Sequence, residues 1–382
     1  MFRELLTAVI ITSVISTSAF AGGVKYKDGD KYVKMGGRIQ LQYHKVDPDG
    51  GESTDDVFFR RFRPYIEGSI HKDWKGKFQW DMGKAHGDNE IAVKDAYMQY
   101  KGIKNMKITV GNANYPFSRE KLTSSKKQQL VERTFVGDHN YGTPDRQMGV
   151  YVQGHNGTKK FDWAVGVADA RIDPDAKKLD FASGANDQKD WNEGLMLGGR
   201  ISFHPFGKLK MSQGDFTGKT KATISVAAFS WSNDDDTNTR TDSGADTSKG
   251  KKPDVSKVTG VEISGAFRGA GFSVDAQYNM FDAKTVDSAV TSGIYENGST
   301  QLTNLAIEGG YMFARKFEIV AGYSSQDADG YSDAWTRTAI GVNYFIHKHD
   351  IKVQATYRMN KNMKGQEGID EDELFVQTQY VF

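Results

Sequence analysis

Two arginines spaced two residues apart, Arg61 and Arg63, are the side chains of this sequence best suited to hold a solute. They lie in the segment Phe58–Gly68, which has the two-residue period of a β-strand. The apolar face of that strand would consist of Phe58, Phe62 and Ile66. The opposite, inward face would then carry Arg61, Arg63, Tyr65 and Glu67. A guanidinium stays charged and offers a fork of N–H donors matched to oxyanions, so the segment predicts anion-binding side chains in a wet interior.

The same alternation places Arg60 on the outward face, where it would meet lipid phosphates or a neighbouring subunit. An alternative reading is that the inward arginines are simply solvated and balanced by carboxylates. The candidate balancing residues are Glu67, Asp81 and Asp95. The arginines of this strand alone therefore do not decide whether the protein selects anions.

A long polar connection, residues 112–145, adds further charge. Its basic residues are Arg119, Lys121, Lys126, Lys127 and Arg133, and its acidic residues are Glu120, Glu132, Asp138 and Asp145. Loops of this length in compact proteins are usually functional or disordered. In a barrel wide enough to leave an aqueous channel, we expect this loop to fold inward and narrow the pore.

The elements that would position these residues are strands with one apolar and one polar face. In the segment Arg38–Tyr43, for example, apolar residues alternate with Arg38, Gln40 and Gln42. About sixteen such segments are expected, centred near Leu41, Arg63, Gln79, Ala96, Ile108, Val150, Val165, Gly199, Ile224, Ile263, Ala276, Ile307, Val320, Ile340, Gln354 and Phe375. The pattern predicts an all-β fold, a transmembrane antiparallel β-barrel with an inward-folded constriction loop.

The connections between these segments alternate in length, as in outer-membrane barrels. Short turns are expected at 71–73, 102–103, 155–157, 269–270, 314–315 and 347–348, with mostly longer polar loops between them. The segment 205–218 is longer than this rule allows, so the sequence does not decide whether it contains one additional hairpin.

The N-terminus predicts export. Arg3 is followed by a short apolar run and by Ala19-Phe20-Ala21, which fits cleavage of a signal peptide after Ala21. We therefore expect a signal peptide at 1–21 and a barrel domain at 22–382. The sequence ends in an alternating strand with a C-terminal phenylalanine, Phe382, as outer-membrane barrels commonly do. The predicted location is the outer membrane, in contact with its lipid and lipopolysaccharide.

Composition excludes several other classes. The formal net charge of +1 gives no reason to expect a nucleic-acid partner, and the absence of cysteine excludes disulfides and thiolate chemistry. The histidines lack metal-site spacing and no nucleophile motif is present, so no enzyme, metal or cofactor is expected. A soluble β-sandwich would also alternate, but aromatic residues recur near strand ends, as in the girdles of membrane barrels.

Several motifs resemble one family, the phosphate-selective porins O and P. They are Arg60–Arg63, Lys94–Tyr97, Tyr115–Ser125, Leu130–Arg133 and Gly341–Phe345, in the family's order along the chain. The resemblance implies a sixteen-stranded homotrimer that passes small, phosphate-like anions through a central site. Carried over position by position, that site consists of Arg61, Arg63, Lys121, Arg133 and Asp95, with Tyr65 as a weaker candidate.

The later strands depart from the family pattern because they carry few basic residues. Their inward positions include Arg200 but otherwise mostly Glu262, Asp275, Gln277 and Glu318, and one late loop holds the acidic run Asp234-Asp235-Asp236. These residues favour a broader anion or oxyanion pore over strict phosphate selectivity. The alternative is a general or structural barrel, such as a non-specific pore, a partner sheath or an adhesin.

Overall fold

The structure, a computed structural model, describes residues 23–83, 91–173, 175–181, 183, 185–186, 193–233 and 253–382. The predicted signal peptide, residues 1–21, and the acidic run Asp234-Asp235-Asp236 lie outside the described residues. Within these ranges, none of the helices has the length and apolar character needed to cross a lipid bilayer.

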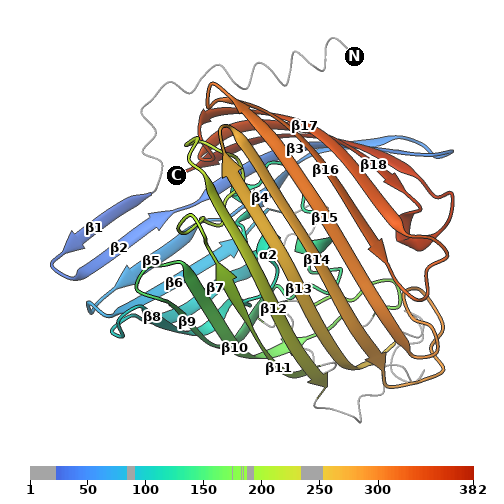
Figure 1. The fold of residues 1–382 in the computed structure, drawn as a ribbon, viewed down its shortest axis with the longest axis horizontal. Helices are drawn as coiled ribbons and strands as arrows, with labels where there is room; N and C mark the ends of the chain where they lie inside the picture. The colour runs from blue at the N-terminus through green and yellow to red at the C-terminus, as the bar shows by residue number, and fades with distance from the viewer. Residues whose placement is uncertain are drawn as a thin grey trace.

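In the described part of the chain, nineteen antiparallel strands form one sheet that closes into a barrel, because β19 pairs with β3 (Figure 1). The strands are β1 (Val24–Asp28), β2 (Lys31–Gly36), β3 (Arg38–Pro48), β4 (Thr54–Phe62), β5 (Tyr65–Ser69), β6 (Trp74–Asp81), β7 (Ala92–Tyr100), β8 (Met106–Asn114), β9 (Arg146–His155), β10 (Phe161–Arg171), β11 (Glu193–Phe203), β12 (Lys221–Asn233), β13 (Val255–Gly269), β14 (Phe272–Thr285), β15 (Ser299–Phe313), β16 (Phe317–Asp327), β17 (Trp335–His347), β18 (Ile351–Lys361) and β19 (Glu371–Val381). The predicted all-β antiparallel barrel is confirmed.

The division into nineteen strands differs from the expected sixteen for local reasons. Gly37 separates β2 from β3, and Arg63 with Pro64 separates β4 from β5, where proline has no N–H to donate to the ladder. A side chain at Gly37 would overlap the Phe382 ring, and the two residues exchange backbone hydrogen bonds of 2.8 and 3.0 Å. β2 pairs with β5 on one side and with β1 on the other, which makes β1 an additional strand at the edge of the sheet (Figure 1).

Apolar side chains cover the outside of the barrel, as the alternation predicts. In β11, Leu195, Leu197 and Ile201 are 61%, 58% and 63% exposed, whereas Arg200 and Ser202 between and beside them are buried on the inner side. The same alternation of exposed and buried residues continues from β12 to β17. Each of the strands β10 to β19 is paired with a strand on both sides, so their backbone polar groups are satisfied and the apolar surface can face lipid.

A β-bulge in β4 corrects one expectation from the sequence. Gln40 of β3 pairs with Arg61, but Leu41 pairs with Phe59, so Arg60 is an extra residue on its strand. The bulge shifts the phase: Phe59 is 53% exposed on the outer face, and Arg60 turns inward beside Arg61. The prediction that Phe58 shares the outward face with Phe62, and that Arg60 faces lipid, is therefore wrong.

The short turns occur on one rim, where the sequence places them. One example is the two-residue hairpin of Ala270 and Gly271, whose φ angles of 52° and 89° are both positive and suit the tight turn of a twisted hairpin. The connection between β11 and β12, residues 204–220, is much longer than the other turns of this rim. It does not add a hairpin but folds back into the barrel, where Leu209 and Gln213 are buried.

Candidate anion-binding constriction

The connection between β8 and β9, residues 115–145, folds into the barrel and is here called the constriction loop. It contains one short helix, α2 (Arg119–Leu122), and two 3₁₀ turns, Ser125–Lys127 and Phe135–Gly137. Ser118 caps α2, because its side chain accepts a hydrogen bond from the backbone N–H of Lys121 at 3.1 Å. Regular structure at this point directs the Lys121 side chain to a fixed place in the interior.

Aromatic packing holds the beginning of the constriction loop. Phe117 is fully buried, with its ring 5.0 Å from that of Phe229 in β12 and 5.7 Å from that of Phe281 in β14. Tyr115 packs edge-on against Phe229 and Tyr151. This cluster is an apolar core inside the barrel, and it holds the beginning of the loop against β9, β12 and β14.

Carboxylates and amides of β13 and β14 bind α2 directly. Glu262 accepts hydrogen bonds from the backbone N–H groups of Ser118 and Arg119, at 2.7 and 3.0 Å. The Arg119 guanidinium pairs with Asp275 at 3.0 Å, and Gln277 accepts from the backbone of Glu120. Glu262 and Asp275, two of the acidic residues that argued against strict phosphate selectivity in the sequence, therefore bind the constriction loop itself.

A second anchoring site lies farther along the loop. Glu318 of β16 accepts from the Gln129 amide at 2.7 Å, and Asn343 of β17 donates to the Gln129 carbonyl at 2.9 Å. Lys352 of β18 donates to the Gln128 carbonyl at 2.9 Å. Strands β13–β18 thus hold the loop from α2 to Gln129, mostly through its backbone.

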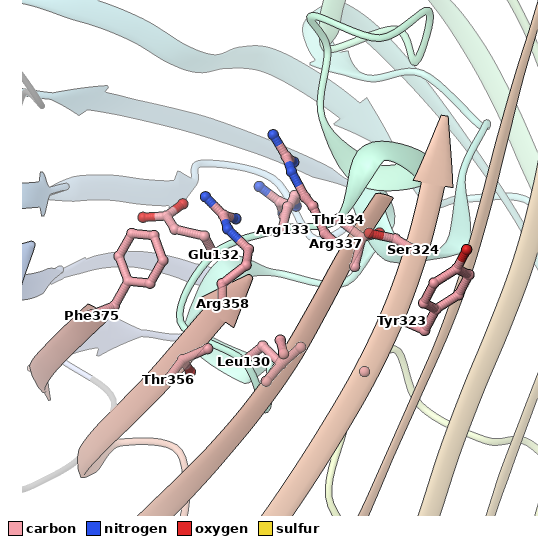
Figure 2. Close-up of a pocket in the computed structure, with 12 residues that line it drawn as sticks. Leu130, Glu132, Arg133, Thr134, Tyr323, Ser324, Arg337, Thr356, Arg358 and Phe375 are labelled. Carbon is pink, nitrogen blue, oxygen red and sulfur yellow. The ribbon is translucent and has the colours of Figure 1, made fainter. Parts of the chain in front are cut away.

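The third anchor joins the loop to the bulged strand. Arg60 of β4 forms a two-pronged pair with Glu132, at 2.6 and 3.0 Å, and an Arg61 nitrogen lies 3.7 Å from the same carboxylate. Burial would raise the pKa of Glu132, but the guanidiniums of Arg60 and Arg61 lower it well below its ordinary value. Figure 2 shows Glu132 beside Arg358 and Phe375, with Arg133 and Arg337 close by. Glu132 therefore remains an anion that fixes the loop end.

Between the constriction loop and strands β3–β9 lies a cavity of about 320 Å³, here called the basic cavity. Seven basic side chains and two carboxylates are among the residues that line it. The basic ones are Arg38, Arg63, Lys77, Lys121, Lys126, Arg133 and Arg146, and the acidic ones are Glu67 and Asp95. Tyr65, Ser124 and Ser125 add hydroxyl groups. The excess of cations makes the cavity suited to hold an anion.

Carboxylates neutralise some of these cations. Asp95 pairs with Lys77 through one oxygen and with Arg146 through the other, the latter at 2.6 Å. Asp145 lies 3.0 Å from Lys121 and 3.2 Å from Arg146. In the same way, Arg63 pairs with Asp81 at 2.5 Å. These pairs fix the orientation of the cations around the basic cavity.

Three lining cations have no carboxylate within ion-pair distance among the described residues. Arg38 donates to Ser124 at 3.0 Å, and Arg133 donates to the carbonyl of Thr123 at 2.9 Å. Both keep a buried Nε without a hydrogen-bond partner in the described part of the chain. Lys126 is the third; burial and the nearby Arg38 lower the pKa of its ammonium to about 8. Charge at these three positions is not compensated locally.

Comparison with known proteins identifies the family. The family model described as "Phosphate-selective porin O and P" matches residues 33–382. The chain belongs to this porin family. Porin O of Pseudomonas aeruginosa is 31% identical over 118 residues, which cover 29% of this chain and 27% of Porin O. The match thus spans only about a quarter of that relative's length.

Solved structures support the fold of this porin. An anion-selective porin from Comamonas acidovorans superposes with a TM-score of 0.62 at 12% identity, covering 92% of this chain and 100% of that one. OmpT of Vibrio cholerae, an outer membrane protein in its trimer form, gives a TM-score of 0.55 at 14% identity, with 92% and 99% covered. The family and these folds confirm the predicted barrel and its location in the outer membrane.

The basic cavity brings together most of the residues that the sequence singled out. Arg63, Tyr65, Asp95, Lys121 and Arg133 all line it. Arg61 does not, because its guanidinium turns toward Gln40 at 3.1 Å and toward Glu132. In this porin, Arg61 fixes the loop beside the cavity. The assignment of these residues to anion binding stays a prediction.

Four lining cations of this porin were not among the predicted site residues. They are Arg38, Lys77, Lys126 and Arg146. Arg38 has a signal in the sequence, since it starts an inward face with Gln40 and Gln42, and its backbone pairs with that of Arg63. Arg146 follows the loop directly, but only the fold shows that it meets Asp95.

In the described ranges, no group of histidine and acidic residues could hold a metal ion.

Proposed function

We propose that this porin is an anion-selective diffusion channel, with phosphate or a related oxyanion as its preferred solute. The solute passes through the basic cavity, between the constriction loop and strands β3–β9. The family membership supports a channel, and the lining of the cavity supports the choice of anions.

The observation that carries this proposal is the uncompensated charge of Arg38, Lys126 and Arg133. Each lines the basic cavity, and each lacks a carboxylate partner among the described residues. A buried guanidinium with unused N–H groups costs free energy unless a hydrogen-bond acceptor reaches it. An anion in the cavity supplies such an acceptor, and an oxyanion can accept from several donors at once.

The carboxylates around the cavity make binding reversible. Conduction requires a site that attracts the solute but also releases it. Asp95 and Asp145 reduce the positive field of Lys77, Lys121 and Arg146 and therefore limit how tightly an anion is held. A carboxylate oxygen that already accepts one hydrogen bond has room for another, so Asp95 can also accept the proton of a hydrogen phosphate.

The passage continues toward the short-turn rim. A second cavity of about 630 Å³ lies there, lined by Lys101, Lys107, Arg200 and Lys208 among others. Leu122, at the end of α2, lines both cavities. An anion that leaves the basic cavity past Leu122 thus enters a second space with basic walls.

The barrel is proposed to work as a homotrimer embedded in lipid and lipopolysaccharide. The trimer form of OmpT, which shares the barrel fold, supports the trimeric state. The exposed apolar side chains of β11 to β17 support contact with lipid on that side.

The proposal is tested by planar-bilayer recording of the purified protein. With a potassium chloride gradient, the reversal potential should show anion preference. Phosphate added to a constant chloride background should then reduce the chloride current, because it competes for the basic cavity.

The reversal potential and the phosphate inhibition together distinguish the anion channel from a general pore and from a sheath or adhesin. A parent protein that prefers cations would overturn the anion channel altogether. Anion preference without inhibition by phosphate would instead support the general pore, and absence of conductance would support a sheath or adhesin.

A further inference from the structure

The long turn between β11 and β12, residues 204–220, enters the barrel from the short-turn rim, which is the periplasmic rim in outer-membrane barrels. It rises toward the constriction loop, which enters from the opposite rim. Gln213 and Asp215 are only 2% and 3% exposed, which is unusual for polar residues of a turn. Burial of these groups needs specific partners.

Gln213 has four such partners, on three different elements. Its Oε1 accepts from the backbone N–H of Gln129 at 2.7 Å, and its own N–H donates to the Lys127 carbonyl at 3.0 Å. Its Nε2 donates to Glu308 of β15 at 2.6 Å, and its carbonyl accepts from His349 at 2.9 Å. One residue thus joins the constriction loop to the wall and to the turn between β17 and β18.

The rest of the turn is built to hold Gln213 in place. Asp215 accepts from the backbone N–H groups of Thr217, Gly218 and Gly271, at about 3 Å each. Phe216 packs edge-on against Phe345 and His349, with ring centres 4.9 and 5.0 Å away. Arg268 donates to the Ser212 carbonyl at 2.8 Å. The turn is therefore a folded unit with its own contacts to the wall.

The two residues that Gln213 holds are next to the basic cavity. Lys127 and Gln129 flank Gln128, whose carbonyl accepts from Lys352, and Lys126 just before them lines the cavity. Lys126 belongs to a 3₁₀ turn that includes Lys127. A displacement of the Lys127 backbone would therefore move the Lys126 ammonium.

We propose that residues 204–220 are a second constriction element, which braces the constriction loop from the periplasmic side and so sets the position of Lys126. Gln213 is the positioning residue. The same turn contributes three residues, Lys208, Leu209 and Met211, to the wall of the second cavity near the short-turn rim. It therefore also narrows the exit of the channel on that side. This inference rests on the proposed function, because it assigns the turn a part in anion selectivity.

The test compares Gln213→Leu with the parent in planar bilayers. Leucine keeps the volume and removes both side-chain hydrogen bonds, so the loop segment should gain mobility. We expect noisier single-channel current, a reversal potential shifted toward zero, and phosphate inhibition weakened by about tenfold. Thr220→Ala is the matched control, because Thr220 is an exposed residue of the same turn; it should behave as the parent does.

Hydrogen exchange on the unaltered trimer gives a second measurement that does not depend on a variant folding. Residues 124–130 and 208–216 should exchange at similar, slow rates. Rapid exchange of the turn beside a protected loop would overturn the inference, and so would a Gln213→Leu channel equal to the parent in noise, selectivity and inhibition. A parent without anion preference would instead overturn the proposed function, which keeps the two failures distinct.

Discussion

The two sides of the barrel use charged residues in different ways. Strands β13–β18 direct theirs at the constriction loop: Glu262, Asp275, Glu318 and Lys352 all bond to it. The side formed by β3–β9 faces the loop across the basic cavity, where cations outnumber carboxylates. The comparison shows that the charge of a lumen cannot be judged by counting residues, because the acids on one side are used to hold the loop.

Removing a carboxylate that holds the constriction loop should have the largest effect on the channel. It would test whether the acidic residues of β13–β18 serve to anchor the loop. In Glu262→Ala, the N-terminus of α2 and Arg200 both lose their carboxylate, which is fully buried. Breaking a buried pair of this kind costs about 3–5 kcal/mol. We expect larger and irregular single-channel conductance, because the N-terminus of α2 is no longer held to β13.

The matched control is Lys104→Ala, an exposed residue of a short turn, which should leave the conductance unchanged. A steady current of parental size in Glu262→Ala would mean that the carboxylate does not hold the loop.

Removing cations from the basic cavity should change selectivity rather than conductance. In the double variant Lys121→Ala with Arg133→Ala, two lining cations are lost while Glu262 and Glu318 still anchor the loop. We expect anion preference to decline and phosphate inhibition to weaken by about tenfold, or about 1.4 kcal/mol. Reversal potentials and phosphate titration measure both quantities, and an unchanged titration would exclude these residues from the site.

A pH titration sharpens the same comparison. The pKa of Lys126 is about 8, so its ammonium is mostly charged at neutral pH and loses its charge as the pH rises through that value. Anion preference in potassium chloride should therefore fall between about pH 7 and about pH 9. In Lys126→Met the preference should start lower and stay flat over this range. An equal decline in both proteins would assign the titration to another group.

The smallest effect is expected from Arg63→Lys. The charge remains, but the fork that pairs with Asp81 and faces the cavity is replaced by a single ammonium. Phosphate inhibition should weaken about threefold, while chloride preference stays as in the parent. A change in chloride preference as large as that in phosphate inhibition would contradict the role given to the fork.

The sequence predicted the barrel because alternation records which face of a strand is apolar, and each expected centre except Arg63 lies inside a strand. Three of the seven cations that line the basic cavity, Arg63, Lys121 and Arg133, were also among the predicted site residues. It missed the inward turn of Arg60, because an added residue in a ladder leaves no local signature. The role of Glu262 could not be predicted either, since its partner Ser118 is 144 residues away in the chain.

The extra residue in β4 has a consequence for how such channels diversify. A single insertion or deletion in a strand normally exchanges its inner and outer faces along the rest of its length. Here the break at Pro64 lies only a few residues beyond the bulge, so a change of one residue near Phe59 would be confined to this short stretch. A lumen arginine can therefore be gained or lost through chain length alone, without disturbing the lipid-facing residues of the strands that follow.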